Sequence, residues 1–210
     1  MASLGATAAA EWAVAARPIP GEHVSGDRHV AVSGDRLVVA VIDGLGHGPD
    51  AAHASARAAG VLEAHPGERP DALLRRCHEE LRSTRGAAIT IASIDEAGGE
   101  MTWVGVGNVQ AAVLRSHPAP AGVREWVPLR GGVVGYLLPS LRPGTVRLNQ
   151  DDVIVFATDG VRPVFGDWPG PAEPPGALAA RILEAQGRDT DDALVFVARY
   201  RGGGLPTKAE

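Results

Sequence analysis

The sequence has little of what several classes of protein depend on. Among its 210 residues Cys77 is the single cysteine, so the chain can form neither an internal disulfide nor a zinc site built from cysteines. No apolar run approaches the roughly 20 residues that a membrane-spanning helix needs. The alanine-rich start lacks a basic segment and is interrupted by Glu11, which argues against a secretory signal. We therefore expect a cytoplasmic protein with no membrane partner.

Aromatic residues and positive charge are also scarce. Aromatic side chains make up 4% of the residues and hydrophobic residues 45%, so the core must consist mainly of valine, leucine, isoleucine and alanine. The formal net charge is -5, whereas a nucleic-acid-binding protein normally carries a basic face, so we expect no nucleic-acid partner. The length fits one domain. We expect a single domain over residues 1–200 and a mobile tail at 201–210.

Apolar runs bounded by glycine, asparagine and aspartate predict the secondary structure. Strands are expected at 12–17, 28–32, 36–43, 88–94, 100–106, 109–114, 145–148, 153–157 and 193–200. Helices are expected at 49–65, 70–83 and 177–186, and the segment 162–176, rich in proline and glycine, is typical of an irregular loop. Strands joined by short turns, with two helices inserted early and one late, predict an α+β fold of mainly antiparallel sheets with helices packed outside them.

Aspartates recur where these strands begin or end. The positions are Asp27, Asp43 before Gly44, Asp159 before Gly160, and the pair Asp191 and Asp192. Strand ends hold a carboxylate rigidly, so these acids could converge at one edge of the sheets. Clustered carboxylates repel one another, and a hard divalent cation, which prefers oxygen ligands, relieves that repulsion. Two such ions roughly 3.5–4 Å apart can clamp a phosphate for in-line displacement.

A simpler interpretation exists at each position. Asp-Gly and Gly-Asp are common turn sequences, and any one of these sites taken alone favours a turn. Asp35, in Ser33-Gly34-Asp35, is expected to be such a turn residue, joining the second and third strands in a hairpin. The pattern alone therefore predicts a possible divalent-metal site and nothing more specific.

Several short motifs, taken in order, resemble one known family over about residues 21–200. The chain resembles the PPM-type (type 2C) metal-dependent Ser/Thr protein phosphatases, in the SpoIIE branch, and in particular the small stand-alone phosphatases of the stressosome pathway. The motifs are Gly21-Glu-His-Val-Ser-Gly-Asp27, Ala40-Val-Ile-Asp-Gly-Leu-Gly-His-Gly48, Val106-Gly-Asn-Val109, Ala157-Thr-Asp-Gly-Val161 and Thr190-Asp-Asp-Ala-Leu194.

The resemblance implies a fold, a cofactor and a set of ligands. The fold is two packed antiparallel sheets flanked by helices, an αββα sandwich. The cofactor is Mn²⁺ or Mg²⁺, as two ions, and water attacks phosphorus directly without a phosphoenzyme. The implied metal ligands are Asp27, Asp43, the backbone carbonyl of Gly44, Asp159 and Asp191, and Asp192 stands where the family often has a residue that supports the ligands.

The resemblance also implies a reaction and a partner. A phosphorylated STAS-domain protein, such as a stressosome scaffold or an anti-anti-sigma factor, would be the substrate in bacterial stress signalling. His47 matches the Gly-His-Gly of many bacterial members, and an imidazole could protonate the departing alkoxide. Alternatively, His47 merely caps or packs at the start of the following helix. Arg17 is a possible counterpart of the phosphate-contacting arginine in larger relatives, or only a residue on a strand.

Two other readings of the sequence are open. Gly44-Leu-Gly-His-Gly48 follows a strand and opens a helix, as phosphate-binding glycine loops do. It lacks the third glycine of a dinucleotide loop and the Lys-Ser/Thr of a P-loop, and Asp43 would repel a phosphate. The chain could also be a catalytically weak, phosphatase-like binding module for STAS proteins. Loss of a ligand aspartate would indicate such a module, and none of the four is missing.

Overall fold

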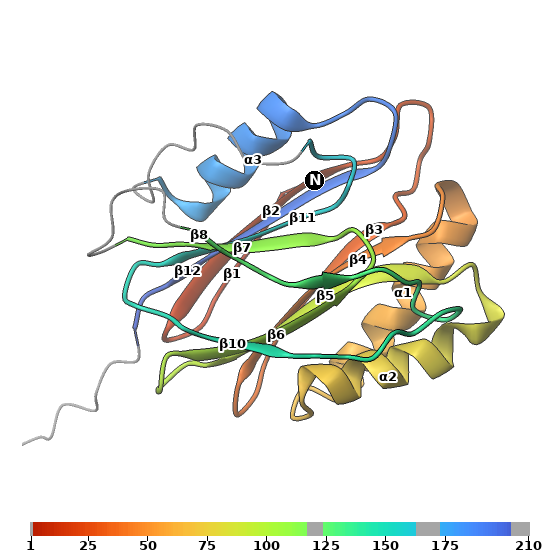
Figure 1. Cartoon of the computed structure of the whole chain (residues 1–210). Helices are drawn as coiled ribbons and strands as arrows, with labels where there is room; N and C mark the ends of the chain where they lie inside the picture. The colour runs from red at the N-terminus through yellow and green to blue at the C-terminus, as the bar shows by residue number, and fades with distance from the viewer. Residues whose placement is uncertain (1, 117–123, 163–172, 203–210) are drawn as a thin grey trace, which may run out of the picture.

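The protein is a sandwich of two β-sheets with helices on both outer faces (Figure 1). The computed structural model describes residues 2–116, 124–162 and 173–202. The first sheet has six strands, in the order β1 (Ala2–Ala6), β2 (Ala10–Arg17), β12 (Ala193–Tyr200), β11 (Val153–Ala157), β7 (Gln110–Leu114) and β8 (Arg124–Trp126). The second sheet has the order β10 (Gly144–Arg147), β6 (Glu100–Val106), β5 (Ala87–Asp95), β4 (Leu37–Gly44) and β3 (Asp27–Ser33), with β9 (Leu129–Arg130) beside β6.

The helices cover the sheets unequally. α3 (Pro175–Gln186) packs on β2 and β12 of the first sheet, whereas α1 (Gly48–Ala64) and α2 (Pro70–Glu80) cover the second sheet. Within the described residues, every strand pair is antiparallel except β6 with β9. The predicted α+β class, with two packed antiparallel sheets flanked by helices, is therefore confirmed.

The apolar core lies in three layers that follow this architecture. Between the sheets, Phe156 and Phe196 meet edge to face, with ring centroids 5.8 Å apart, and Trp103 from the second sheet packs into the same cluster. The small residues Ala54 and Ala58 let α1 approach the second sheet closely. As expected from the composition, aliphatic side chains and alanine make up most of all three layers.

Some elements differ from the sequence prediction. β1 was not expected, because its sequence of alanine, serine, leucine and glycine has no period of two; its pairing with β2 makes it a strand. The short strands β8 and β9 were also missed. The second helix ends at Glu80 and continues as a 3₁₀ turn over Leu81–Ser83. α3 begins at Pro175, two residues before the expected start, because proline is tolerated in a first helical turn.

Parts of two predictions fall outside the described residues. They are 163–172 of the expected loop and 203–210 of the expected tail. In the part of the chain that the structure describes, no helix combines the length and the apolar character needed to cross a bilayer.

Cys77 lies on the inner face of α2, as its spacing from Leu73, Leu74 and Leu81 predicts. Its side chain is 0% exposed and belongs to the layer between α1, α2 and the second sheet. Burial raises the pKa of the thiol to about 12, so the reactive thiolate is scarcely populated near neutral pH. The residue is thus a core side chain, where a free thiol packs as a small hydrophobic group.

This burial generates a first test. We expect the native protein to react with an aromatic disulfide reagent at pH 8 only as it unfolds, whereas the denatured chain reacts at once with one thiol. Cys77→Ala should lower the free energy of unfolding by about 1 kcal/mol, because it removes one buried sulfur. Stopped-flow absorbance measures the rate of labelling, and rapid labelling of the folded protein would contradict the placement of Cys77.

Candidate metal centre

Four aspartates from the two sheets meet at one end of the sandwich. Asp27 begins β3 and Asp43 stands one residue before the end of β4, and the antiparallel register pairs these two residues directly. Asp159 follows β11 and Asp191 precedes β12, which are neighbouring antiparallel strands of the other sheet. The Oγ1 atom of Thr158 joins the two sheets here, since it donates to Oδ2 of Asp27 at 2.7 Å.

The charges of these carboxylates affect one another's pKa values. Burial raises the pKa of Asp43 to about 8, and repulsion by Asp159, Asp191 and Asp192 contributes to the rise. Burial also raises the pKa of Asp27 well above its usual value, as do the charges of Asp43, Asp192 and Asp159. The pKa of Asp191 is raised for the same two reasons. Without a cation, the cluster therefore resists carrying its full negative charge.

Two uncharged side chains orient these acids. Thr158 Oγ1 accepts from the backbone N–H of Leu194 at 2.9 Å while it donates to Asp27. Asn108 Nδ2 donates to Oδ2 of Asp159 at 2.6 Å. The sequence reasoning assigned no role to either residue, although both stand in quoted motifs. Each residue contacts an aspartate that is distant in the sequence, as Asn108 and Asp159 are 51 residues apart. The sequence alone therefore carries no signal of these contacts.

Asp192 is placed differently from the other acids. It is 3% exposed, and its two oxygens accept from the backbone N–H groups of Ile19 at 2.8 Å and Gly26 at 2.6 Å. These hydrogen bonds hold both ends of the segment that leads into Asp27. Asp192 therefore anchors the chain that carries a candidate ligand, in keeping with the supporting position implied by the resemblance.

The glycines around the cluster have local structural reasons. A Cβ atom on Gly44 would collide with the backbone carbonyl of Ala51, and one on Gly26 would come within 2.7 Å of the Cβ of Ala51. Gly46 and Gly48 have φ angles of +84° and +75°, which favour glycine. Close packing of α1 and left-handed turns thus account for the glycine-rich segment without a bound nucleotide.

His47 stands at the start of α1, at the edge of the acid cluster. Its backbone occupies the N-cap position, but its side chain makes no capping hydrogen bond. Nδ1 lies 3.0 Å from Oε1 of Glu22, a residue to which the sequence reasoning gave no role. His47 is also near enough to Asp191 to oppose the rise in the pKa of that carboxyl.

Asp35 lies apart from this cluster. It occupies the turn between β3 and β4, at the opposite end of the hairpin from Asp27 and Asp43. The backbone N–H of Gly34 donates to the carbonyl of Arg36 at 3.1 Å and closes that turn. The prediction that Asp35 is a turn residue is confirmed.

The donor set of the cluster fits a divalent cation. Among residues 2–116, 124–162 and 173–202, no group of three or more histidine, cysteine, aspartate or glutamate side chains lies in an arrangement that could hold a metal ion. The acid cluster nevertheless consists of hard oxygen donors whose charges are otherwise unbalanced, and Mg²⁺ and Mn²⁺ bind such donors.

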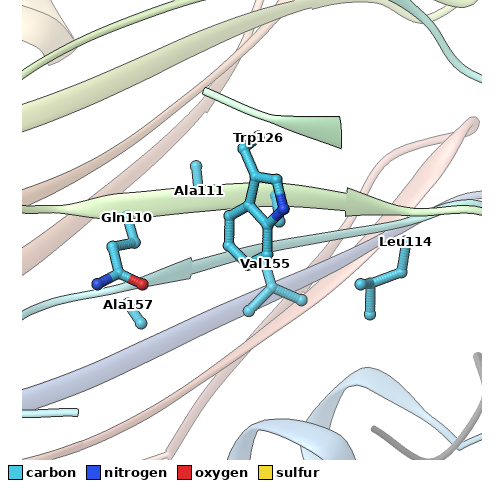
Figure 2. A pocket seen from close by; sticks show the side chains of 7 residues that line it. Gln110, Ala111, Leu114, Trp126, Val155 and Ala157 are labelled. Atoms are coloured by element: carbon cyan, nitrogen blue, oxygen red, sulfur yellow. The ribbon is translucent and has the colours of Figure 1, made fainter. Parts of the chain in front are cut away.

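One hollow adjoins the acid cluster, and a second lies over the first sheet. A cavity of about 480 Å³ has Asp27 in its wall, together with Arg17, Arg28, His23 and His29. Arg17 also forms an ion pair with Asp189 at 2.8 Å. A second hollow of about 10 Å³ lies over β7, β8 and β11, where Figure 2 shows Trp126 and Val155 among its lining side chains. This second hollow has no ionisable group in its lining.

Comparisons with known proteins agree with this arrangement. A family model described as Stage II sporulation protein E (SpoIIE) matches residues 33–201. Phosphoserine phosphatase RsbX of Bacillus subtilis (strain 168) is 32% identical over 145 residues, which cover 67% of this chain and 69% of RsbX.

Two solved structures share the fold over nearly the whole chain. One was solved in work on the bacterial stressosome as a modular system adapted to control secondary messenger signalling. It has a TM-score of 0.82 and 28% identity and covers 90% of this chain and 99% of its own. The other is RsbX in complex with magnesium, with a TM-score of 0.81 and 20% identity, covering 95% and 100%. At that identity the second likeness concerns the fold alone.

The family match covers most of the described chain, and the identity to RsbX extends over two thirds of it. The likeness to a stand-alone phosphatase of the SpoIIE branch, predicted from the motifs, is confirmed. This chain belongs to the SpoIIE family of PP2C-type phosphatases.

Proposed function

We propose that the chain is a divalent-metal-dependent protein serine/threonine phosphatase that acts on a regulatory phosphoprotein in bacterial stress signalling. The observation that carries the proposal is the convergence of Asp27, Asp43, Asp159 and Asp191 at the facing ends of two sheets. The relationship to a phosphoserine phosphatase supports this reaction. Because all four acids are present, a binding module that has lost catalysis is not favoured.

In this proposal the acid cluster and the carbonyl of Gly44 hold Mg²⁺ or Mn²⁺, with two ions as the expected number. A bound divalent cation lowers the pKa of water and neutralises charge that develops on a transferring phosphoryl group. Asp192 keeps Asp27 in place through the segment 19–26. Thr158 and Asn108 fix the orientation of Asp27 and Asp159.

His47 is the candidate that protonates the leaving alkoxide. Its ring is exposed beside the cluster, and Glu22 contacts Nδ1, so Nε2 is left to face a substrate. An imidazole can give up a proton near neutral pH. The relatives support a partner in the stressosome pathway, and a phosphorylated STAS-domain protein is the substrate that we propose.

Two changes in melting temperature test the metal proposal. Asp43→Asn should raise the melting temperature of the metal-free protein, because burial and neighbouring carboxylates raise the pKa of Asp43 at a cost in folding free energy that asparagine does not incur. Saturating Mg²⁺ or Mn²⁺ should raise the melting temperature of the wild type by about 5–10 °C and that of Asp43→Asn much less. Differential scanning calorimetry with EDTA and with each metal measures both. Equal melting temperatures of the wild type with and without metal would contradict the site.

A second test separates metal ligands from turn residues. Asp159→Asn should reduce phosphate release from p-nitrophenyl phosphate to background, because it removes a charge from the cluster with almost no change in shape. Asp35→Asn is the matched control and should keep nearly full activity, since a turn accepts asparagine as readily as aspartate. Comparable losses in both variants would mean that the effect reflects folding and not chemistry.

A third test addresses His47. His47→Gln should lower kcat on a phosphoserine protein by about 10²-fold, because a serine alkoxide needs a proton to leave. The same variant should hydrolyse p-nitrophenyl phosphate almost normally, since nitrophenolate is a stable anion. Single-turnover rates on both substrates decide the matter. An equal loss on the two substrates would assign His47 a structural role at the start of α1.

A further inference from the structure

Large apolar side chains are exposed in an uneven pattern. In the part of the chain that the structure describes, six large hydrophobic residues are exposed: Leu4, Val24, Leu45, Trp126, Tyr136 and Leu137. Tyr136 is 86% exposed and Leu137 60%, among the largest exposed fractions of the six. Leu45 follows Asp43 by two residues, and Val24 precedes Asp27 by three. Leu45 and Val24 thus belong to segments at the acid cluster. Tyr136 and Leu137 belong to a turn that is hydrogen-bonded to the loops next to it.

The segment that carries Tyr136 and Leu137 is a tightly bonded turn. The backbone N–H and carbonyl of Val133 exchange hydrogen bonds with Leu137 at 2.9 Å and 2.8 Å. The N–H of Gly135 donates to Nδ1 of His78 at 2.9 Å, and Val134 is 0% exposed. The backbone is therefore fixed from both sides, and the exposure of the two side chains does not result from fraying.

This turn is tied to the loops that surround the acid cluster. Val134 and Ala87 exchange backbone hydrogen bonds at 3.0 Å and 2.9 Å, and the preceding residue, Gly86, accepts from the N–H of Leu45 at 3.0 Å. On the other side, the N–H of Gly107 donates to the carbonyl of Arg130 at 2.9 Å, one residue before Asn108. In Figure 1 the turn between β9 and β10 lies at the same end of the sandwich as the start of α1.

A rigid apolar turn beside a charged centre suits one kind of substrate. A small phosphate ester gains nothing from apolar groups outside the charged site. When a phosphorylated residue of a folded protein enters that site, the protein surface around this residue contacts the residues at the edge of the site. Tyrosine is enriched among residues that dominate binding at protein interfaces, and a preformed turn orders its side chains at little entropic cost.

We propose that the turn Val133–Leu137 is a docking surface for a folded phosphoprotein, with Tyr136 and Leu137 packing on apolar surface beside its phosphorylated serine or threonine. Leu45 continues this surface toward Asp43. The inference rests on the proposed function, since it assigns substrate preference to residues outside the metal centre.

The test compares substrates in a double variant, Tyr136→Ala with Leu137→Ala. The substrates are a phosphoserine STAS-domain protein that the wild type hydrolyses, a short phosphoserine peptide copied from it, and p-nitrophenyl phosphate. We expect kcat/KM on the protein to fall about 10-fold or more, and kcat/KM on the other two to stay within about two-fold. Leu4→Ala is the matched control: Leu4 is 77% exposed but lies on the edge strand β1 of the other sheet, and its variant should leave all three values unchanged.

A binding measurement keeps the docking surface and the phosphatase activity separable. The phosphorylated STAS-domain protein is titrated against Asp43→Asn, with and without the two alanine substitutions, and we expect about 10-fold weaker binding with them. Unchanged binding would overturn the docking surface, whatever the activity. A loss of equal size on all three substrates would overturn it too, since the turn would then support the metal centre. Wild type that binds but hydrolyses nothing with metal would instead refute the proposed function.

Discussion

Repulsion among carboxylates is the constraint around which this end of the molecule is built. Asp27, Asp43, Asp159 and Asp191 gather where burial and mutual repulsion raise the pKa of several of them. Rigid structure is needed to hold repelling groups together, and here two sheets provide it. One sheet pairs Asp27 with Asp43 by strand register, and the other brings Asp159 and Asp191 to neighbouring strand ends. Stability is given up at the place where chemistry is proposed, as is common at functional sites.

The side chains around the acid cluster hold it in place through different chemical groups. Thr158 links the sheets through one hydroxyl that both donates and accepts. Asp192 uses its charge to hold two backbone N–H groups, so it needs no metal to balance it. Asp152, at the opposite end of β11 from Asp159, is a further buried carboxylate, and Arg115 pairs with it at 2.6 Å. Among the described residues, no arginine pairs with Asp27, Asp43, Asp159 or Asp191 in this way.

The sequence predicted most strands and the helices because each depends on local pattern, whereas the candidate ligands were implied by the resemblance to a known family. Apolar runs define β4, β11 and β12, and an aspartate at the end of such a run is visible without a structure. Asn108, Thr158 and Glu22 could not be assigned, because each acts on a partner brought near only by folding. β1 was missed for a related reason: its residues carry no strand pattern, and its conformation comes from pairing with β2. The roles of His47 and of the individual ligands remain predictions.

The contact between α1 and the two sheet-end glycines has a consequence for sequence variation. Ala51 meets Gly26 and Gly44, each next to a candidate ligand, and neither glycine has room for a Cβ atom. At Gly44 a gain of volume cannot be offset at Ala51, because the added Cβ atom would meet the backbone of Ala51. At Gly26 the added atom would meet the Cβ atom of Ala51, which only a change to glycine removes. Random mutagenesis should find all three almost intolerant. Neighbouring exposed positions of α1, such as Ala56, should accept many residues, so a map of tolerated substitutions would trace the helix–sheet contact without a structure.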